Sequence, residues 1–342
     1  MRVEIKKHTL QFKRPSGTSR GVLTQKESWF IRIIENQKVG IGESSLIAGL
    51  SVDAKPHFEK QLRQFAQDFS FHQRLSNLNA WPSIQMGFET ALLSLKAPQW
   101  WELYPSAFSQ GKASIPINGL VWMGSREFMK NQIKELLDKG FRCVKLKIGA
   151  LNFEEELNIL RYIRKDFSEQ NLTIRVDANG AFSNVNALDK LQELSAFNIH
   201  SIEQPIAPSQ WDEMASLCEQ SPIDIALDEE LIGVFGHQKR EAMLDQIKPQ
   251  FIILKPSLIG GFKVAEKWIS MANERKIGWW ITSALESNIG LNAIAQWTYS
   301  LKAKGHQGLG TGSLFTNNID LPLNVSDGYL SIDENKPWQF NF

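Results

Sequence analysis

Apolar and polar residues alternate along the first 45 residues of the chain, which is the pattern of half-buried β-strands. The stretches VEIKKHTLQF, SWFIRIIE and KVGIGESS carry this pattern or are rich in β-prone residues. From residue 54 to residue 98 apolar positions recur at helical spacing instead, as in AKPHFEKQLRQFAQDF. Strands followed by helices predict an α+β domain over residues 1–110.

Near Gly111 the pattern changes, and short apolar runs begin to alternate with amphipathic segments of helical length. The predicted strands are residues 114–121, 143–148, 173–177, 199–203, 223–228, 251–255, 278–282 and a short eighth near Gln307–Leu309. Eight strands separated by helices predict a closed parallel barrel over residues 111–315 rather than an open sheet. The tail, residues 316–342, is strand-like again and is expected to return to the first domain.

Five charged residues close five successive apolar runs at nearly even intervals. They are Lys147, Asp177, Glu203, Asp228 and Lys255, and subtraction of successive positions gives steps of 30, 26, 25 and 27 residues. One strand, one helix and two loops are together about this long. Because a parallel barrel carries its active site at the carboxyl ends of its strands, these five side chains are expected to converge.

Lys145 and Lys147 share one face of the strand VKLKI, since side chains alternate sides along a strand. Val144, Leu146 and Ile148 occupy the other face and should pack on helices outside the barrel. Both lysines are therefore predicted to point into the barrel mouth, where two like charges need compensation. The alternative is an exposed strand edge with solvated lysines.

Asp177, Glu203 and Asp228 occupy equivalent strand ends, where three carboxylates would repel one another. A hard divalent cation with oxygen ligands, Mg²⁺ or Mn²⁺, accounts for such a set. Without a metal, one carboxylate should be protonated. Three unrelated solvated acids are the alternative. Asn179 falls on the same side as Asp177 and is placed to orient a ligand.

Lys255 ends the run FIIL and should approach the metal from the side opposite Lys147. A lysine that acts as a base must be neutral, and burial together with the positive charges of Lys145 and the metal lowers its pKa. The metal and Lys255 would then stabilise the anion formed by removal of a proton α to a carboxylate. Glu229 is expected to turn towards Lys255.

Composition limits the possible partners. The 342 residues include 38 basic and 37 acidic ones, for a net charge of +1, and no basic run predicts nucleic-acid binding. No stretch has the roughly 20 apolar residues of a membrane helix, and the N-terminus lacks a signal-peptide core. Two cysteines do not make a disulfide framework. We expect a cytoplasmic enzyme for a small-molecule carboxylate substrate, with a homo-oligomer left open.

Together these residues resemble the pattern of the enolase superfamily, and within it the muconate-lactonising-enzyme-like subgroup. The matching positions are the Lys-x-Lys pair Lys145 and Lys147, the metal triad Asp177, Glu203 and Asp228, and the opposing Lys255. The resemblance covers nearly the whole chain. It implies a (β/α)7β TIM-like barrel, an α+β capping domain built from residues 1–110 and the tail 316–342, and Mg²⁺ or Mn²⁺ as cofactor.

The segments INGLVWMG, PSIQMGFETALLSL, WWITSALESNIGLNAIAQW and QGLGTGSLFTNN are similar to those of subgroup members that act as carbon–oxygen lyases in menaquinone biosynthesis. This resemblance implies a syn dehydration of 2-succinyl-6-hydroxy-2,4-cyclohexadiene-1-carboxylate to 2-succinylbenzoate through an enediolate. Lys147 would be the base, and Lys255 would stabilise the anion. Ser283, Arg175 and Arg20 are further candidate substrate contacts, though Ser283 stands near a helix start and Arg175 could form a salt bridge inside the barrel. The loops at 14–21 and 44–51 would cover the succinyl tail.

Two other functions remain open. A racemase or epimerase of N-acylamino acids or dipeptides would use Lys147 and Lys255 as bases on opposite faces. The dipeptide branch is disfavoured, because the region that would carry an Asp-x-Asp pair offers only Asp320. A metal-dependent binding barrel without catalysis is the remote alternative.

Overall fold

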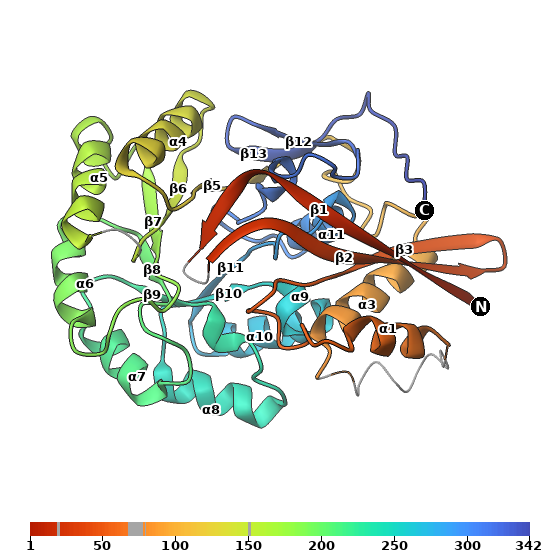
Figure 1. Ribbon diagram of the computed structural model, residues 1–342, viewed down its shortest axis with the longest axis horizontal. Helices are drawn as coiled ribbons and strands as arrows, with labels where there is room; N and C mark the ends of the chain where they lie inside the picture. Colours follow the sequence, from red (N-terminus) through yellow and green to blue (C-terminus); the bar gives the residue numbers. More distant parts are fainter. Residues whose placement is uncertain (19–20, 68–77, 79, 150–151) are drawn as a thin grey trace.

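The N-terminal part of the chain is an antiparallel sheet covered by helices (Figure 1). The computed structural model describes residues 1–18, 21–67, 78, 80–149 and 152–342. The sheet has the order β1 (Arg2–Thr18), β2 (Gly21–Glu35), β3 (Lys38–Ser45). Alternate residues of β2 (Trp29, Ile31 and Ile33) pack in one buried cluster with residues of α1 (Phe58–Gln67) and α3 (Pro82–Lys96). This confirms the predicted strands and helices of the first region.

Two glycines let β3 and α3 approach closely. A Cβ atom built at Gly42 would lie 2.1 Å from the carbonyl oxygen of Gly87, and one built at Gly40 would lie 2.1 Å from that of Ala91. Both contacts are with backbone atoms, so neither neighbour can rotate away. The sheet is thus held against α3 at a distance that only glycine permits.

The larger part of the chain is a curled parallel sheet of seven strands in the order β11-β10-β9-β8-β7-β6-β5. The strands are β5 (Gly119–Val121), β6 (Cys143–Lys147), β7 (Thr173–Asp177), β8 (Ser201–Glu203), β9 (Ile225–Leu227), β10 (Phe251–Leu254) and β11 (Gly278–Ile281). The helices are α4 (Arg126–Asp138), α5 (Phe153–Asp166), α6 (Ala187–Ser195), α7 (Trp211–Gln220), α8 (His237–Ile247), α9 (Pro256–Ile259), α10 (Phe262–Glu274) and α11 (Asn288–Ser300).

The predicted eighth strand is present as two parallel bridges that close the barrel. Gln307 bridges to Ile117, just before β5, and Gly308 bridges to Thr282, just after β11. Four backbone hydrogen bonds of 2.8 to 3.1 Å hold this segment between the two ends of the sheet. The structure therefore confirms the (β/α)7β TIM-like barrel.

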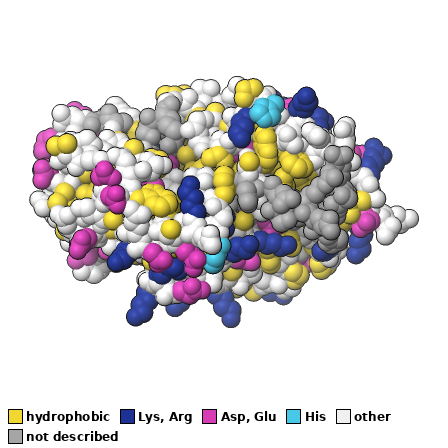
Figure 2. All heavy atoms as spheres, turned by 90° about the horizontal axis from the view of Figure 1, so that it is seen from below, with side chains coloured by type: hydrophobic (Ala, Val, Ile, Leu, Met, Phe, Trp, Pro, Cys, Tyr) yellow, Lys and Arg dark blue, Asp and Glu magenta, His cyan; other side chains and the backbone are white. Residues whose placement is uncertain are grey.

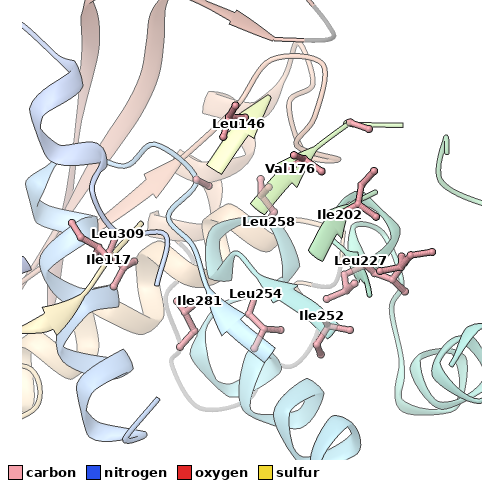
Figure 3. Close-up of a cluster of buried hydrophobic side chains, with 14 of the residues drawn as sticks. Ile117, Leu146, Val176, Ile202, Leu227, Ile252, Leu254, Leu258, Ile281 and Leu309 are labelled. Atoms are coloured by element: carbon pink, nitrogen blue, oxygen red, sulfur yellow. The ribbon is translucent and has the colours of Figure 1, made fainter. Parts of the chain in front are cut away.

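Apolar side chains of the barrel wall point outwards and pack under the helices. Figure 3 labels several of them, including Leu146 of β6, Val176 of β7 and Ile202 of β8. Val144 and Ile148, which share a face with Leu146, are buried in the same cluster, as the alternation of VKLKI predicts. The opposite face of these strands is thereby left for polar side chains inside the barrel.

Helix starts in the barrel carry capping side chains. Ser125 Oγ accepts a hydrogen bond from the backbone N–H of Phe128 at the start of α4. Ser287 Oγ does the same for Ile289 at the start of α11. Such caps satisfy backbone donors that the helix itself leaves unpaired, and so fix where each helix begins.

The C-terminal segment contacts both parts of the molecule. β12 (Leu323–Ser326) and β13 (Tyr329–Ile332) form a hairpin, and β13 pairs with β4 (Ile115–Pro116) at the beginning of the barrel. Further along, the ring of Phe340 lies edge-on to Phe30 of the first sheet, with centroids 5.0 Å apart. The domain boundaries at residues 110 and 316 remain a prediction.

On the face shown in Figure 2, acidic and basic side chains lie among one another, with apolar side chains between them. Among the described residues, no helix is both long enough and apolar enough to cross a membrane.

Candidate active site

The strand register brings the predicted residues together at the carboxyl ends of the strands. Lys147 lies opposite Asp177 across β6 and β7, and Asp177 lies opposite Glu203 across β7 and β8. Asp228 directly follows β9, and Lys255 directly follows β10. All five side chains converge because each residue stands at the carboxyl end of its strand and its side chain lies on the inner face of the barrel.

Lysines and carboxylates alternate in this cluster. Lys145 Nζ lies 2.9 Å from Asp177 Oδ2 and also pairs with Glu203. Lys147 Nζ lies 2.9 Å from the same Asp177 oxygen. Lys255 Nζ pairs with Asp228 and lies 3.9 Å from Glu203 Oε1. The like charges that the sequence placed in the barrel mouth are therefore compensated by one another.

Burial and the charges of neighbouring groups shift the pKa values of these lysines and carboxylates, often in opposite directions. Burial alone would raise the pKa of Asp177, but Lys145, Lys147 and Lys255 together hold it well below its ordinary value. For Glu203, burial and then the charge of Asp177 raise the pKa well above its ordinary value. Burial disfavours the charged form of Lys145, yet the surrounding carboxylates raise its pKa. The pKa of Glu203 is therefore shifted in the opposite direction to those of Asp177 and Asp228, which the lysines hold below their ordinary values.

The donor set fits a divalent cation. The Oε1 atom of Glu203 is buried and has no hydrogen-bond partner. As arranged, no three His, Cys, Asp or Glu side chains among the described residues stand close enough together to hold a metal. The reason is local, since Lys145 sits between Asp177 and Glu203 and Lys255 beside Asp228. A hard cation would stabilise this arrangement, in which a buried oxygen of Glu203 has no hydrogen-bond partner and the carboxylates of Asp177 and Asp228 lie beside it.

Asn179 contacts the predicted base. Lys147 Nζ donates a hydrogen bond of 2.6 Å to Asn179 Oδ1, and Asn179 Nδ2 donates one of 2.9 Å to Glu229 Oε1. The backbone of Asn179 is left-handed, with φ of 45°, and its N–H bonds to Asp177 Oδ1. Glu229 therefore fixes the amide of Asn179, and its charge also favours the cationic form of Lys255. Substrate binding by Asn179 remains a prediction.

A cavity of about 550 Å³ opens over the lysines. The sequence-predicted residues that line it are Lys145, Lys147, Asn179, Lys255 and Ser283. Ser283 Oγ lies 2.6 Å from Thr311 Oγ1, which also lines the cavity. Thr311 was not predicted from the sequence, although it lies in QGLGTGSLFTNN, one of the segments that carry the family resemblance.

Strand β2 and one predicted loop of the first domain contribute to the cavity wall. Ile47 and Leu50 belong to the loop at 44–51, and Leu23 lies on β2. The loop prediction for residues 14–18 was wrong, because the backbone pairing of β1 with β2 continues to Thr18. Arg20, the candidate contact for the succinyl carboxylate, lies outside the described residues. Apolar side chains from the cap therefore face the lysines across the cavity.

Arg175 occupies a deeper layer inside the barrel. Its guanidinium lies 4.0 Å from the ring centroid of Trp280, and Nη1 donates a hydrogen bond of 2.9 Å to the carbonyl oxygen of His306. These contacts hold Arg175 against protein atoms rather than in the cavity wall. Its role in substrate binding stays a prediction.

Comparison with known proteins agrees with this geometry. Residues 129–337 match the family described as Enolase C-terminal domain-like. The o-succinylbenzoate synthase of Desulfotalea psychrophila is 48% identical over 97% of this chain and 99% of that protein. The chain belongs to the o-succinylbenzoate synthase family of the enolase superfamily.

Solved structures of the superfamily share the fold. The crystal structure of MenC from D. psychrophila LSv54 superposes with a TM-score of 0.87 at 44% identity, covering 97% of this chain and 99% of that one. A dipeptide epimerase from Enterococcus faecalis V583, solved with Mg and a dipeptide, superposes with a TM-score of 0.82 at 17% identity and 97% coverage of both chains. At that identity the epimerase supports the fold alone.

Proposed function

We propose that this protein is an o-succinylbenzoate synthase, a carbon–oxygen lyase that dehydrates 2-succinyl-6-hydroxy-2,4-cyclohexadiene-1-carboxylate to 2-succinylbenzoate. The observation that carries the proposal is the 48% identity to a synthase over nearly the full length of both chains. The site supports it, since Lys147 and Lys255 line one cavity above three carboxylates.

Lys147 acts as both base and acid in this proposal. Its Nζ removes the proton α to the ring carboxylate, and the C–H electron pair moves into that carboxylate to give an enediolate. The electron pair then returns to form the new C=C bond as the C–O bond to the hydroxyl breaks. The same Nζ then returns the proton to the departing oxygen, so one water leaves from the face on which the proton was removed. General acid–base transfer of this kind contributes about 10²- to 10⁴-fold to rate.

Lys255 stabilises the negative charge that develops on the substrate carboxylate, because its ammonium is fixed in the cavity wall before reaction. Asp177, Glu203 and Asp228 would hold Mg²⁺, which when bound supplies a Lewis acid for the carboxylate oxygens.

Asn179 orients Lys147 through their 2.6 Å hydrogen bond. Leu23, Ile47 and Leu50 exclude water on the cap side.

The test is a spectrophotometric assay of aromatisation by the full-length protein with Mg²⁺. We expect rapid turnover by the native protein and by Lys134→Ala, an exposed lysine on α4 that serves as the matched control. Lys147→Ala should lose at least about 10³-fold in kcat while still binding 2-succinylbenzoate.

Absence of turnover by the native, Mg²⁺-loaded protein would refute the synthase assignment. Racemisation of N-acylamino acids, followed as α-proton exchange in D₂O, would then be measured with the same variants. Equal activity in Lys147→Ala and native protein would instead refute the role of Lys147.

A further inference from the structure

The apolar residues that line the cavity over the lysines fall into two groups, each of which defines one arm of the cavity. The arm on the cap side is lined by apolar residues of the first domain and of the loops after the last strands, namely Leu23, Ile47, Leu50, Leu285 and Leu314. The other arm, which we name the seam arm, is lined by Leu120, Leu136, Phe141 and Val325. The catalytic chemistry described above uses only the space at the lysines.

The seam arm follows a gap in the pairing of the barrel wall. β5 is the last strand of the parallel sheet, and the eighth strand bridges to Ile117, ahead of β5, rather than to Gly119–Val121. All of these residues are described, and no backbone hydrogen bond joins Gly119–Val121 to residues 308–310. The barrel wall therefore lacks backbone hydrogen bonds between β5 and residues 308–310.

Glycines border the gap on both sides. Gly119 stands on one side, where a Cβ would lie 2.7 Å from Leu136 Cδ2, and Gly310 stands on the other, where a Cβ would lie 3.3 Å from Ile117 Cδ1. Neither glycine has a side chain that reaches into the gap, and the cavity lining includes Leu136 of α4 as well as Leu120. Leu136 is then the side chain that covers it from outside.

The β12–β13 hairpin forms the outer wall of the seam arm, near α4 and β5 at the upper edge of Figure 1. Ile117 donates a backbone hydrogen bond of 2.9 Å to Gly328 in the hairpin turn. A Cβ at Gly140 would lie 3.1 Å from the Cα of Asp327, so the turn packs tightly on the end of α4. The hairpin is thus a fixed wall.

The residues at the inner end and in the middle of the seam arm indicate which kind of ligand it would bind. Lys145, Lys147 and Lys255 line the inner end, where a carboxylate gains charge-assisted hydrogen bonds. Leucine, phenylalanine and valine side chains line the middle, and exposed Lys139 and Asp327 stand at the outer end. We propose that the seam arm is a ligand subsite that takes the apolar tail of a small carboxylic acid whose carboxylate is held by the catalytic lysines.

Isothermal titration of the Mg²⁺-loaded full-length protein with benzoate and its 4-ethyl, 4-butyl and 4-hexyl derivatives tests this subsite. In the native protein we expect Kd to fall about fourfold for each methylene up to butyl, as expected for about 0.8 kcal/mol per buried methylene. Val325→Trp should flatten the series without changing the Kd of benzoate itself. Leu136→Trp is the second variant, in case the hairpin substitution disturbs folding.

Asn324→Trp is the matched control, because Asn324 is an exposed neighbour on the same strand and its side chain points to the other face. It should bind the series as the native protein does. A flat series in the native protein would overturn the proposal. So would a steep series in all variants, because the tails would then occupy the cap-side arm, and Leu50→Trp would flatten it. These titrations need no turnover, so their outcome is independent of the aromatisation assay.

Discussion

The carboxylate of Glu43, on β3, accepts hydrogen bonds from the backbone N–H and the hydroxyl of Ser287, at 2.9 and 2.5 Å. The two residues are 244 positions apart in the chain. Glu43 also accepts from the backbone N–H of Gly290, so a side chain of the first sheet satisfies donors at the start of α11. Negative charge is favoured there by the helix dipole.

Removal of this carboxylate should destabilise the whole molecule. We expect Glu43→Ala to lower the free energy of unfolding by roughly 3 kcal/mol or more, because several buried donors lose their acceptor. Glu43→Gln should cost less, since the amide keeps one acceptor oxygen. Urea denaturation followed by circular dichroism measures both. Glu35→Ala, an exposed glutamate on the same sheet, is the control, and equal stability of the two alanine variants would contradict the prediction.

Glu89 makes a second, pH-sensitive connection between the two parts. It lies on α3 and accepts hydrogen bonds from the N–H groups of Phe262 and Lys263 at the start of α10. Burial raises the pKa of Glu89 to about 7, from an ordinary value of 4.5. The folded protein therefore holds this proton at pH values where the unfolded chain has lost it.

The stability contributed by protonation of Glu89 should be complete below pH 4.5 and should be lost as pH rises to about 7. Over that window the loss is on the order of 3 kcal/mol. Urea titrations at pH 4.5, 6 and 8 should show the decline in the native protein relative to Glu89→Gln, which carries no titrating group. Parallel pH profiles for the two proteins would show that Glu89 titrates normally.

Metal binding should be visible as added stability. Because Glu203 has an orphaned buried oxygen beside Asp177 and Asp228, we expect Mg²⁺ to stabilise the native protein, by about 2.7 kcal/mol at a hundred times its Kd. Glu203→Gln should lose most of this stabilisation, and EDTA should remove it from the native protein. Glu219→Gln, on the exposed face of α7, should respond to Mg²⁺ normally. The readout is the Tm with and without Mg²⁺.

Because β3 contacts α3 so closely, we expect that a single methyl group added at Gly42 will destabilise the fold strongly. A Cβ at Gly42 would lie 2.1 Å from a backbone oxygen, so Gly42→Ala must separate the strand from the helix. We expect a loss of about 3 kcal/mol or more, at the upper end for overpacked sites. Gly310→Ala is the control, because its Cβ would have its nearest neighbour at 3.3 Å. Similar Tm values for the two variants would contradict this account.

The barrel and its inward-facing charges could be predicted from the sequence because both follow from local periodicity. The alternation in VKLKI sets the direction of Lys145 and Lys147, and the even spacing of strand ends brings Asp177, Glu203 and Asp228 to one side. Even the short eighth strand at Gln307–Leu309 was within reach of this reasoning.

The contacts between the two parts were beyond such reasoning. Glu43 and Glu89 meet helix starts that lie 244 and 173 residues away, and no local pattern marks a glutamate as the partner of a distant N–H. The alternation of lysines with carboxylates in the site is also a tertiary feature, because it depends on side chains that share one buried volume. The seam arm depends on the lack of backbone pairing between β5 and residues 308–310, and the periodicity of the sequence does not indicate where such pairing is absent.

Closure of the barrel by residues 307 and 308 also sets an order of events during synthesis. Gln307 pairs with Ile117, and subtraction puts these partners 190 residues apart. Until this segment leaves the ribosome, β5 and β11 are two open edges of a parallel sheet, each able to pair with another chain. Such long-range closure is slow, so nascent chains that stop short of residue 307 would be the aggregation-prone species, and a holding chaperone would be of most use to them.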